Sequence, residues 1–302
     1  MLDDLLTEQP NPASRDIDRL PAEGILRIMN AEDRQVAAAA EAEIPQIALA
    51  VDGIVERIRC GGRLFYIGAG TSGRLGVLDA AECRPTFNVA EDQVQGIIAG
   101  GERALSRATE ASEDDKEAGA RDLLARGFTE ADALVGIAAS GRTPYVLGAV
   151  EAARALGALT AGISCARDSA LSRAAAIAIT PLTGPEVIAG STRLKAGTAT
   201  KLVLNMLSTA VMIRLGYVYG NLMVNVQPTN EKLRDRARRI VAQAAGVDRD
   251  EAARWLEAGE NDVRTAIVMA RRGLSRQGAA ELLARHGGRV GEALAEGGSA
   301  AS

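Results

Sequence analysis

Two short loops in this chain combine glycine with hydroxyl side chains directly after an apolar run. The first loop follows Leu64–Ile67, and the second follows Leu134–Ala138. Glycine lets the backbone turn tightly and approach an anion, while a helix that begins in such a loop points unpaired N–H groups at that anion. The residues that we expect to contact a phosphate are Gly70, Thr71, Ser72, Ser140, Gly141 and Thr143. Two such loops on neighbouring strands would hold one phosphate from both sides.

A third candidate contact follows the last expected strand, in the segment TPLTGPEVIAGSTRLKAG at residues 180–197. Ser191 or Thr192 is typical of a helix N-cap, and we expect that helix to run through Leu215. Lys195 would then lie about one turn into the helix, where it could contact an anion or a substrate. The alternative is an ordinary helix cap with a solvent-exposed lysine, and the spacing alone does not choose between them.

Two glutamates have settings that suit acid–base chemistry. Glu82 precedes Pro85, so we expect it on a final helical turn in apolar surroundings, where burial would raise its pKa and favour the protonated acid. Glu113 follows Ser112, which would form a capping box with Asp115. Glu113 would then lie in the first turn of a helix, a setting that suits a base. Each glutamate also has a purely structural explanation, as a stabilising charge at a helix end or as the partner of a neighbouring arginine.

The single histidine limits the chemistry further. His286 is the only histidine in 302 residues, which excludes a site with several histidine ligands and argues against a serine–histidine triad. Cys60, Cys83 and Cys165 are widely spaced, odd in number and form no CxxC pair. They fit a reduced cytosolic protein better than a disulfide framework. Acid–base work therefore falls to carboxylates, lysine or tyrosine.

The composition predicts an ordinary soluble protein that acts on a small molecule. With 47% hydrophobic residues and a net charge of −4, the chain is not expected to bind nucleic acid or an anionic membrane, and any phosphate is left to local loops. The most apolar long segment, Leu202–Leu215, is interrupted by polar residues and falls short of the roughly 20 residues needed to span a bilayer. We expect a buried helix there, no signal peptide and a cytoplasmic location.

These candidates need elements that bring them together. Apolar runs that suggest strands recur between helical stretches, and they are near-continuous, as in parallel strands covered on both faces. The expected strands are Leu64–Ile67, Val94–Ile98, Ala133–Ala138, Leu159–Ile163 and Ala176–Ile179. We predict an α/β fold with a doubly wound, five-stranded parallel sheet in the order 2-1-3-4-5. Ligands bind where the chain leaves neighbouring strands in opposite directions, which places both hydroxyl-rich loops at one crevice.

The chain is expected to divide into three parts. Residues 1–52 form an N-terminal helical segment, and residues 53–229 form the sheet domain that binds the ligand. Residues 230–302 form a C-terminal helical module, where arginine and alanine increase at helical spacing. No polar cluster in this last part suggests chemistry of its own.

The first loop, GAGTSG at residues 68–73, also matches the GxGxxG fingerprint of dinucleotide-binding proteins. Against a dinucleotide stand the hydroxyls of Thr71 and Ser72, the second hydroxyl-rich loop, and the lack of an acidic residue at the end of the second strand. Glu91 and Asp92 have about the right spacing but precede that strand. We therefore favour a sugar phosphate over the nucleotide cofactor of an oxidoreductase.

Longer motifs resemble the N-acetylmuramic acid 6-phosphate etherases, a family built on the sugar isomerase (SIS) domain. The matching segments are YIGAGTSGRLGVLDAAEC at 66–83, GIAASGRTPYV at 136–146, GSTRLKAGTATKLVLNMLSTAVMIRLG at 190–216, GNLMVNVQPTNEKL at 220–233 and RHGG at 285–288. The resemblance extends from Pro10 to His286. These motifs are specific to the etherases rather than to SIS domains in general.

The resemblance implies cleavage of the lactyl ether of N-acetylmuramic acid 6-phosphate to N-acetylglucosamine 6-phosphate and D-lactate, during recycling of peptidoglycan sugars. It implies no metal and no nucleotide cofactor, and it suggests a homodimer. Glu82, in DAAEC, matches the proton donor, and Glu113 matches the second active-site acid. The match around Glu113 is looser, since this chain has EASED at 110–114 where the family often has EGAED. A sugar-phosphate sensor and a sugar-phosphate isomerase remain the alternatives.

The spacing raises one difficulty for this assignment. A straight helix from Ser72 would carry Glu82 about 15 Å from the phosphate loop. Either this helix is short or bent, or Glu82 serves a site near the subunit interface that is completed by a second copy of the chain. The sequence alone leaves both arrangements open.

Overall fold

The computed structural model describes residues 6–107 and 112–296, and the chain divides into two compact units. The first unit comprises Met1–Ala81 and Glu91–Thr209, and the second comprises Glu82–Ala90 and Ala210–Ser302. Two helices, α4 (Gly70–Phe87) and α9 (Lys195–Arg214), begin in the first unit and end in the second. The expected domain boundaries after residues 52 and 229 stay predictions.

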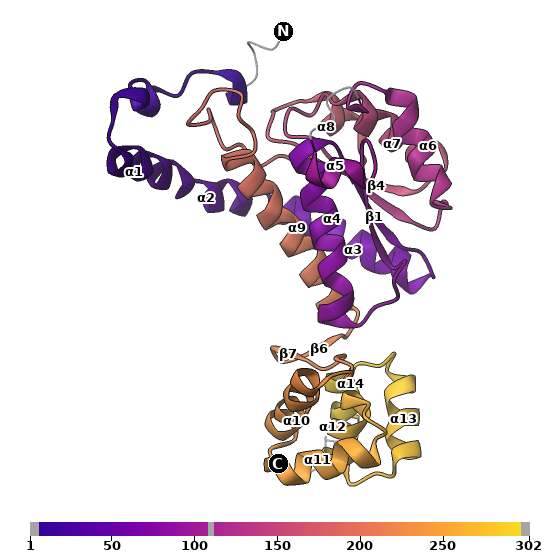
Figure 1. Ribbon diagram of the computed structural model, residues 1–302. Coiled ribbons are helices and arrows are strands. Elements are labelled where there is room, and N and C mark those ends of the chain that lie inside the picture. Colours follow the sequence, from indigo (N-terminus) through magenta and orange to yellow (C-terminus); the bar gives the residue numbers. More distant parts are fainter. Residues whose placement is uncertain (1–5, 108–111, 297–302) are drawn as a thin grey trace. The chain divides into compact units, whose positions relative to one another are not determined.

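The first unit is built on a parallel sheet flanked by helices (Figure 1). The sheet has five strands in the order β2-β1-β3-β4-β5. The strands are β1 (Leu64–Gly68), β2 (Val94–Ile98), β3 (Ala133–Ile137), β4 (Leu159–Ile163) and β5 (Ile177–Ile179). Every residue of β1 and β3 is buried, which explains why the apolar runs are unbroken. The predicted fold class and strand order are confirmed. Both hydroxyl-rich loops therefore follow the carboxyl ends of two neighbouring strands.

Helices cover both faces of the sheet, and alternate residues of β1 show which helix covers which face. Phe65 and Ile67 pack with residues of α7 (Pro144–Ala155) in one core cluster. Tyr66 points to the opposite face and approaches α4 at Gly76, where an added Cβ would lie 3.0 Å from the Cβ of Tyr66. The remaining helices of this unit are α1 (Ala22–Asp33), α2 (Val36–Glu41), α3 (Ile44–Arg59), α5 (Arg103–Ser106), α6 (Lys116–Ala125) and α8 (Ala170–Ala174).

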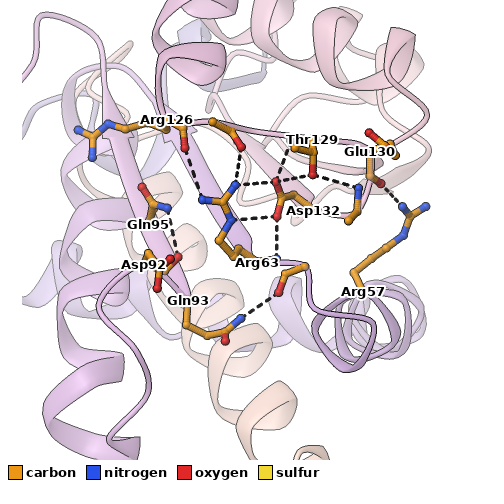
Figure 2. A network of polar contacts seen from close by, with 12 residues as sticks. Arg57, Arg63, Asp92, Gln93, Gln95, Arg126, Thr129, Glu130 and Asp132 are labelled. Carbon is orange, nitrogen blue, oxygen red and sulfur yellow. Dashed lines mark hydrogen bonds and ion pairs between the residues drawn. The ribbon is translucent and has the colours of Figure 1, made fainter.

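At the amino ends of β1 and β3, a buried carboxylate ties the two strands together (Figure 2). Asp132 accepts hydrogen bonds from Arg63 through the backbone N at 2.8 Å, Nε at 3.1 Å and Nη2 at 3.0 Å. It also accepts the backbone N–H of Thr129 at 2.8 Å. Burial alone would raise the pKa of Asp132, but these bonds outweigh burial and hold the pKa below its usual value. The Arg63–Asp132 ion pair thus lies at the end of the sheet opposite to the hydroxyl-rich loops.

The helix α9 is long and apolar enough to cross a membrane by length and composition alone. However, Ala196, Ala199, Val203 and Leu207 recur at helical spacing and are almost fully buried within the first unit. The hydroxyl of Ser208 on the same helix donates to the Asp79 carboxylate of α4 at 3.1 Å. These contacts are those of a core helix in a globular protein, which the sequence also predicts.

The second unit consists of a small antiparallel hairpin followed by helices. Its elements are β6 (Val218–Tyr219), β7 (Leu222–Met223), α10 (Glu231–Ala245), α11 (Arg249–Ala258), α12 (Val263–Arg272), α13 (Arg276–Arg285) and α14 (Val290–Ala295). The first four helices begin after Asn230, Asp248, Asp262 and Ser275, whose side chains accept a backbone N–H of the first turn. One apolar cluster between Val224 and Ala293 fills the interior of this unit. The unit therefore has a core of its own.

Candidate functional site

The carboxyl ends of β1 and β3 border a cavity of about 250 Å³. Its wall comes from the β1–α4 loop, the β3–α7 loop, the start of α9, and two residues from elsewhere in the first unit. The lining residues are Glu8, Ala69, Gly70, Thr71, Ser72, Glu113, Ile137, Ala138, Ala139, Ser140, Thr143, Thr192, Gly197 and Thr200. Six of these carry a hydroxyl group and two carry a carboxylate. The predicted meeting of the two loops at one crevice is therefore found, and its chemistry suits a ligand rich in oxygen.

The β1–α4 loop requires glycine at two positions. Gly70 has a φ of +52°, in the left-handed region that favours glycine. A Cβ added to Gly73 would lie 2.6 Å from the carbonyl oxygen of Gly68, closer than a side chain can approach. This tight turn starts α4 at the cavity wall, with Thr71 and Ser72 in its first turn. The first N–H groups of a helix have no partner within the helix and favour an anion at that position.

The β3–α7 loop turns at Gly141, which has a φ of +63°. A Cβ added there would lie 2.3 Å from Oγ of Ser169. Gly141 itself is not on the cavity wall, so it shapes the loop while Ser140 and Thr143 line the cavity. Thr143 precedes α7 but makes no capping bond with its side chain. Its hydroxyl instead donates to Oε1 of Glu113 at 3.0 Å.

Glu113 lies before α6 and not in its first turn. The N-cap of α6 is Asp115, whose carboxylate accepts the N–H of Ala118 at 2.8 Å. The predicted capping box with Ser112 is therefore wrong, because Asp115 reaches the helical N–H by itself. The carboxylate of Glu113 nevertheless lines the cavity, oriented by the hydroxyl of Thr143.

The helix that carries Glu82 does not end where the sequence suggests. Pro85 lies inside α4, which continues to Phe87. Proline removes only one helical hydrogen bond, to the carbonyl of Ala81, and the buried side chains of Cys83 and Phe87 hold the final turns. The expectation that the helix ends before Pro85 is therefore wrong.

Glu82 is exposed on this helix, so the expected burial of its carboxyl group is not found. It follows Gly70 by twelve residues in an unbroken helix, which corresponds to about 18 Å along the helix axis. Glu82 is not among the residues that line the cavity of its own chain. The helix is thus not short, and the completion of the site by a second copy stays a prediction.

Ser191 and Lys195 do not line the cavity, whereas their neighbour Thr192 does. Lys195 is buried, and its Nζ donates to Oε2 of Glu32 at 2.6 Å. This bond is the main reason that the pKa of Glu32 lies below its usual value. Both expectations for Lys195, a contact with the ligand or a solvent-exposed side chain, therefore differ from its observed place in a buried ion pair.

The start of α9 is capped by Glu186 and not by Ser191 or Thr192. The two carboxylate oxygens of Glu186 accept the backbone N–H groups of Lys195 and Ala196, each at 2.9 Å. Glu186 is fully buried and lies nine residues before Lys195. Capping patterns in a sequence consider only residues next to the start of a helix, so they do not identify Glu186. The side chain of Thr192 is therefore not needed as a cap, and Thr192 lines the cavity.

Sequence reasoning also missed Glu8 and Thr200, which both line the cavity. Thr200 lies on α9 three residues after Gly197, on the same face of the helix. Its neighbours Thr198 and Lys201 are exposed, so the helical period could have separated it from them. Glu8 reaches the cavity through contacts with a segment far along the chain, and no local pattern indicates such a contact.

The single histidine lies in the second unit and is engaged there. His286 contacts the carboxylates of Glu292 and Glu296, and its hydrogen bond is the main reason that the pKa of Glu296 is lowered. Within residues 6–107 and 112–296, no group of three or more histidine, cysteine, aspartate or glutamate side chains is arranged to hold a metal ion. The polar side chains on the described cavity wall are hydroxyls and carboxylates.

Comparison with known proteins adds the family. The family described as the glucokinase regulatory protein N-terminal SIS domain matches residues 46–154, which include both hydroxyl-rich loops. N-acetylmuramic acid 6-phosphate etherases from an Exiguobacterium species, Clostridium beijerinckii and Streptomyces avermitilis are 55%, 52% and 54% identical to this chain. The alignments cover 97%, 98% and 97% of this chain and 100%, 97% and 94% of those proteins. The chain belongs to the N-acetylmuramic acid 6-phosphate etherase family.

Membership of the etherase family confirms the resemblance that the motifs indicated. Among solved structures, a phosphoheptose isomerase from Neisseria gonorrhoeae is similar with a TM-score of 0.50 and 16% identity, over 63% of this chain and 99% of that chain. At such low identity the likeness shows the fold alone. The SIS fold is thus shared with an isomerase, while the sequence favours the etherases over an isomerase or a sensor.

Proposed function

We propose that this protein cleaves the lactyl ether of N-acetylmuramic acid 6-phosphate, giving N-acetylglucosamine 6-phosphate and D-lactate, in the cytoplasmic recycling of cell-wall sugars. The observation that carries the proposal is the cavity at the ends of β1 and β3, in a chain of the etherase family. In this cavity the hydroxyls of two loops share the wall with the carboxylate of Glu113, which accepts a hydrogen bond from Thr143. Hydroxyls and a helix N-terminus suit the phosphate, and a carboxylate suits proton transfer.

The phosphate supplies binding energy that positions the distant reacting carbons. The residues assigned to it are Gly70, Thr71, Ser72, Ser140, Gly141 and Thr143, with Gly141 acting through the shape of its loop. Lys195 contributes by fixing the start of α9, because its Nζ is bonded to Glu32 and its backbone N–H to Glu186. Thr192 and Thr200 then complete the wall on that side.

The reaction is an elimination followed by an addition of water. In the open-chain aldehyde, the C2 proton is acidic because the resulting carbanion is delocalised onto the C1 carbonyl. Glu113 removes this proton, the electron pair forms the C2–C3 double bond, and the C3–O bond breaks with its electrons going to the lactate oxygen. Water then adds to C3 and a proton returns to C2. Each such proton transfer contributes about 10²–10⁴-fold to the rate.

Glu82 is the donor proposed for the departing lactate oxygen. Because Glu82 does not line the cavity of its own chain and lies about 18 Å along α4 from Gly70, we place it in the cavity of a second copy. The active form is then a homodimer with two sites near its interface. A two-fold dimer would supply one Glu82 to each of two equivalent cavities.

The first experiment measures D-lactate release from N-acetylmuramic acid 6-phosphate by the purified wild type and by Glu113→Ala and Glu82→Ala variants. We expect release by the wild type and a loss of at least about 100-fold in each variant. Glu117→Ala, which changes an exposed glutamate on α6, is the matched control and should keep full activity. Binding of the sugar phosphate without lactate release by the wild type would indicate a sensor instead.

A mixing experiment tests the shared site. When Glu82→Ala and Glu113→Ala chains are co-expressed, half of the dimers are mixed, and each mixed dimer has one cavity with both glutamates. Activity should then recover to about a quarter of the wild-type value. No recovery from chains that demonstrably form mixed dimers would show that the two glutamates do not come from different copies.

A further inference from the structure

A cavity of about 360 Å³ lies wholly within the second unit. Part of its wall is the stretch 224–229, which belongs to the motif GNLMVNVQPTNEKL that the proposed reaction does not use. The rest of the described wall comes from Asn88 after α4, the turn at 260–262 between α11 and α12, and Arg264. This cavity shares no lining residue with the one at the ends of β1 and β3, so it is a separate site.

Three residues of this wall have a left-handed backbone, with φ of +51° at Asn88, +53° at Glu260 and +64° at Asn261. In the part of the chain that the structure describes, the only other non-glycine residue with a positive φ is Asp168. Glycine adopts this conformation without steric cost, as the glycines after α10 and α12 do. Side chains that are kept at three such positions around one cavity indicate that the side chains themselves have a use there.

The groups on this wall that are free to bond a ligand are neutral. Among the described residues, no hydrogen bond is found to the side chains of Asn88, Gln227, Thr229 and Asn261. The buried Asn225 donates from Nδ2 to the last carbonyl of α4, which leaves its Oδ1 as an acceptor. Four of these five side chains are carboxamides, each of which offers a donor and an acceptor side by side.

The charged groups on the same wall already have partners. The carboxylate of Glu260 pairs with Arg276 at 2.7 Å. Asp262 accepts the backbone N–H of Thr265 at 2.7 Å, and its carboxylate lies 4.0 Å from the guanidinium of Arg264. The cavity therefore presents charges that are balanced within the wall and suits a ligand without a net charge.

We propose that this cavity is a second ligand site, which binds a small neutral molecule through a secondary amide group. A secondary amide donates through its N–H and accepts through its C=O, so carboxamides around it can replace the hydrogen bonds that it loses on leaving water. Val224, Val226 and Pro228 supply apolar surface for the carbon atoms on either side of the amide. The volume lies in the range of cavities that hold small molecules. Such an amide occurs as the acetamido group of an amino sugar or as the peptide bond of a short peptide.

The experiment titrates the full-length wild type with three neutral probes and follows its amide signals by NMR. N-acetylglucosamine carries the acetamido group, N-acetyl-L-alanine methylamide carries peptide bonds, and glucose offers sugar hydroxyls without an amide. We expect at least one amide probe to shift the signals of residues 224–229 and Asn261, and glucose to leave them unchanged. The amide probe that binds more tightly identifies the source of the ligand. The test needs neither phosphate nor lactate, so this site and the proposed etherase activity can fail independently.

Variants separate the side chains from the fold. Asn261→Gly suits the left-handed turn and removes only the carboxamide, so it should keep the melting temperature and weaken binding of the amide probe about fivefold to tenfold. Gln227→Ala, which changes an exposed side chain on another part of the wall, should weaken binding by a similar factor. The matched control is Asp168→Gly, which makes the same kind of change at a left-handed residue outside the cavity and should bind as the wild type does.

Three results would each overturn the proposal. The first is that neither amide probe shifts signals of the second unit, including the case in which only signals of the first unit move. The second is that glucose shifts the signals of residues 224–229 and Asn261 as strongly as N-acetylglucosamine does. The third is that Asn261→Gly and Gln227→Ala both bind the amide probe with wild-type affinity.

Discussion

At the amino ends of β1 and β3, the carboxylate of Asp132 is surrounded by the guanidinium of Arg63 and by backbone N–H groups, whereas the carboxyl ends of the same strands border a cavity. No lysine or arginine lines the described wall of that cavity, although Glu8 and Glu113 do. One end of the sheet thus satisfies its charge internally, and the other leaves carboxylates for a ligand. The ion pair that stabilises the fold and the cavity proposed for chemistry thus lie at opposite ends of the same two strands.

The largest effect is expected on the unfolding free energy, at Asp132 beside the amino ends of β1 and β3. Asp132→Ala would leave Arg63 without its buried partner, and breaking such a pair costs about 3 kcal/mol or more of unfolding free energy. Urea unfolding followed by circular dichroism measures this loss, and Glu130→Ala, which changes an exposed neighbour, should be near neutral. Lactate release per folded molecule should not change. A fall in kcat for folded Asp132→Ala would show that the ion pair at the amino ends also affects the reaction at the cavity.

The half-buried carboxylate of Asp79 on α4 adds a third setting to the comparison. Burial raises the pKa of Asp79 from 3.8 to about 6, against the opposing hydrogen bonds of Tyr66 and Ser208. Because the folded state then holds a proton that the unfolded state releases, this group lowers stability as pH rises from about 4 to about 6. The full cost, up to about 3 kcal/mol, applies above that range.

Asp79→Asn should therefore stabilise the protein at pH 8 and have little effect near pH 3. The measurement is the difference between the unfolding free energies of variant and wild type across this pH range. Ser208→Ala, which removes one hydroxyl that favours the charged form, should instead destabilise most at high pH. A stability difference between Asp79→Asn and wild type that does not vary with pH would contradict the titration of Asp79.

The smallest effect is expected on kcat, at Thr143 beside the carboxyl ends of β1 and β3. Thr143→Val removes the hydroxyl that orients Glu113 at 3.0 Å, and a hydrogen bond to a charged group is worth about 1.5 kcal/mol. We expect kcat for lactate release to fall about tenfold, with less than about 1 kcal/mol change in stability. Thr143→Ser should keep most of the activity, because it keeps the hydroxyl. Equal losses in both variants would point to packing and not to the hydrogen bond.

The fold could be predicted from the sequence because parallel strands buried on both faces leave unbroken apolar runs, which are separated here by helical stretches. The topology then placed Gly70–Ser72, Ser140 and Thr143 at one crevice, where the structure has them. The prediction that the helix of Glu82 ends before Pro85 failed because packing of Cys83 and Phe87 outweighed the local effect of Pro85.

The residues that sequence reasoning missed share another cause. The Lys195–Glu32 ion pair joins residues 163 positions apart. The segment Leu6–Ser14, which carries Glu8, is bonded to the Gly184–Ser191 loop. Hydrophobic periodicity and capping patterns report on neighbours along the chain. Contacts between distant segments leave no such local pattern, so both the buried lysine and the second carboxylate required the structure.

The segment Leu6–Ser14 is bonded to residues that lie 173 and 174 positions further along the chain. During synthesis this segment emerges well before the Gly184–Ser191 loop exists, so it has no partner there until nearly two-thirds of the 302 residues have been made. Contacts with such long sequence separation also form slowly once the chain is complete. By that time β1, β3 and both hydroxyl-rich loops are already present in the chain. The Glu8 carboxylate therefore reaches its place at the cavity wall only after both of these loops have been synthesised.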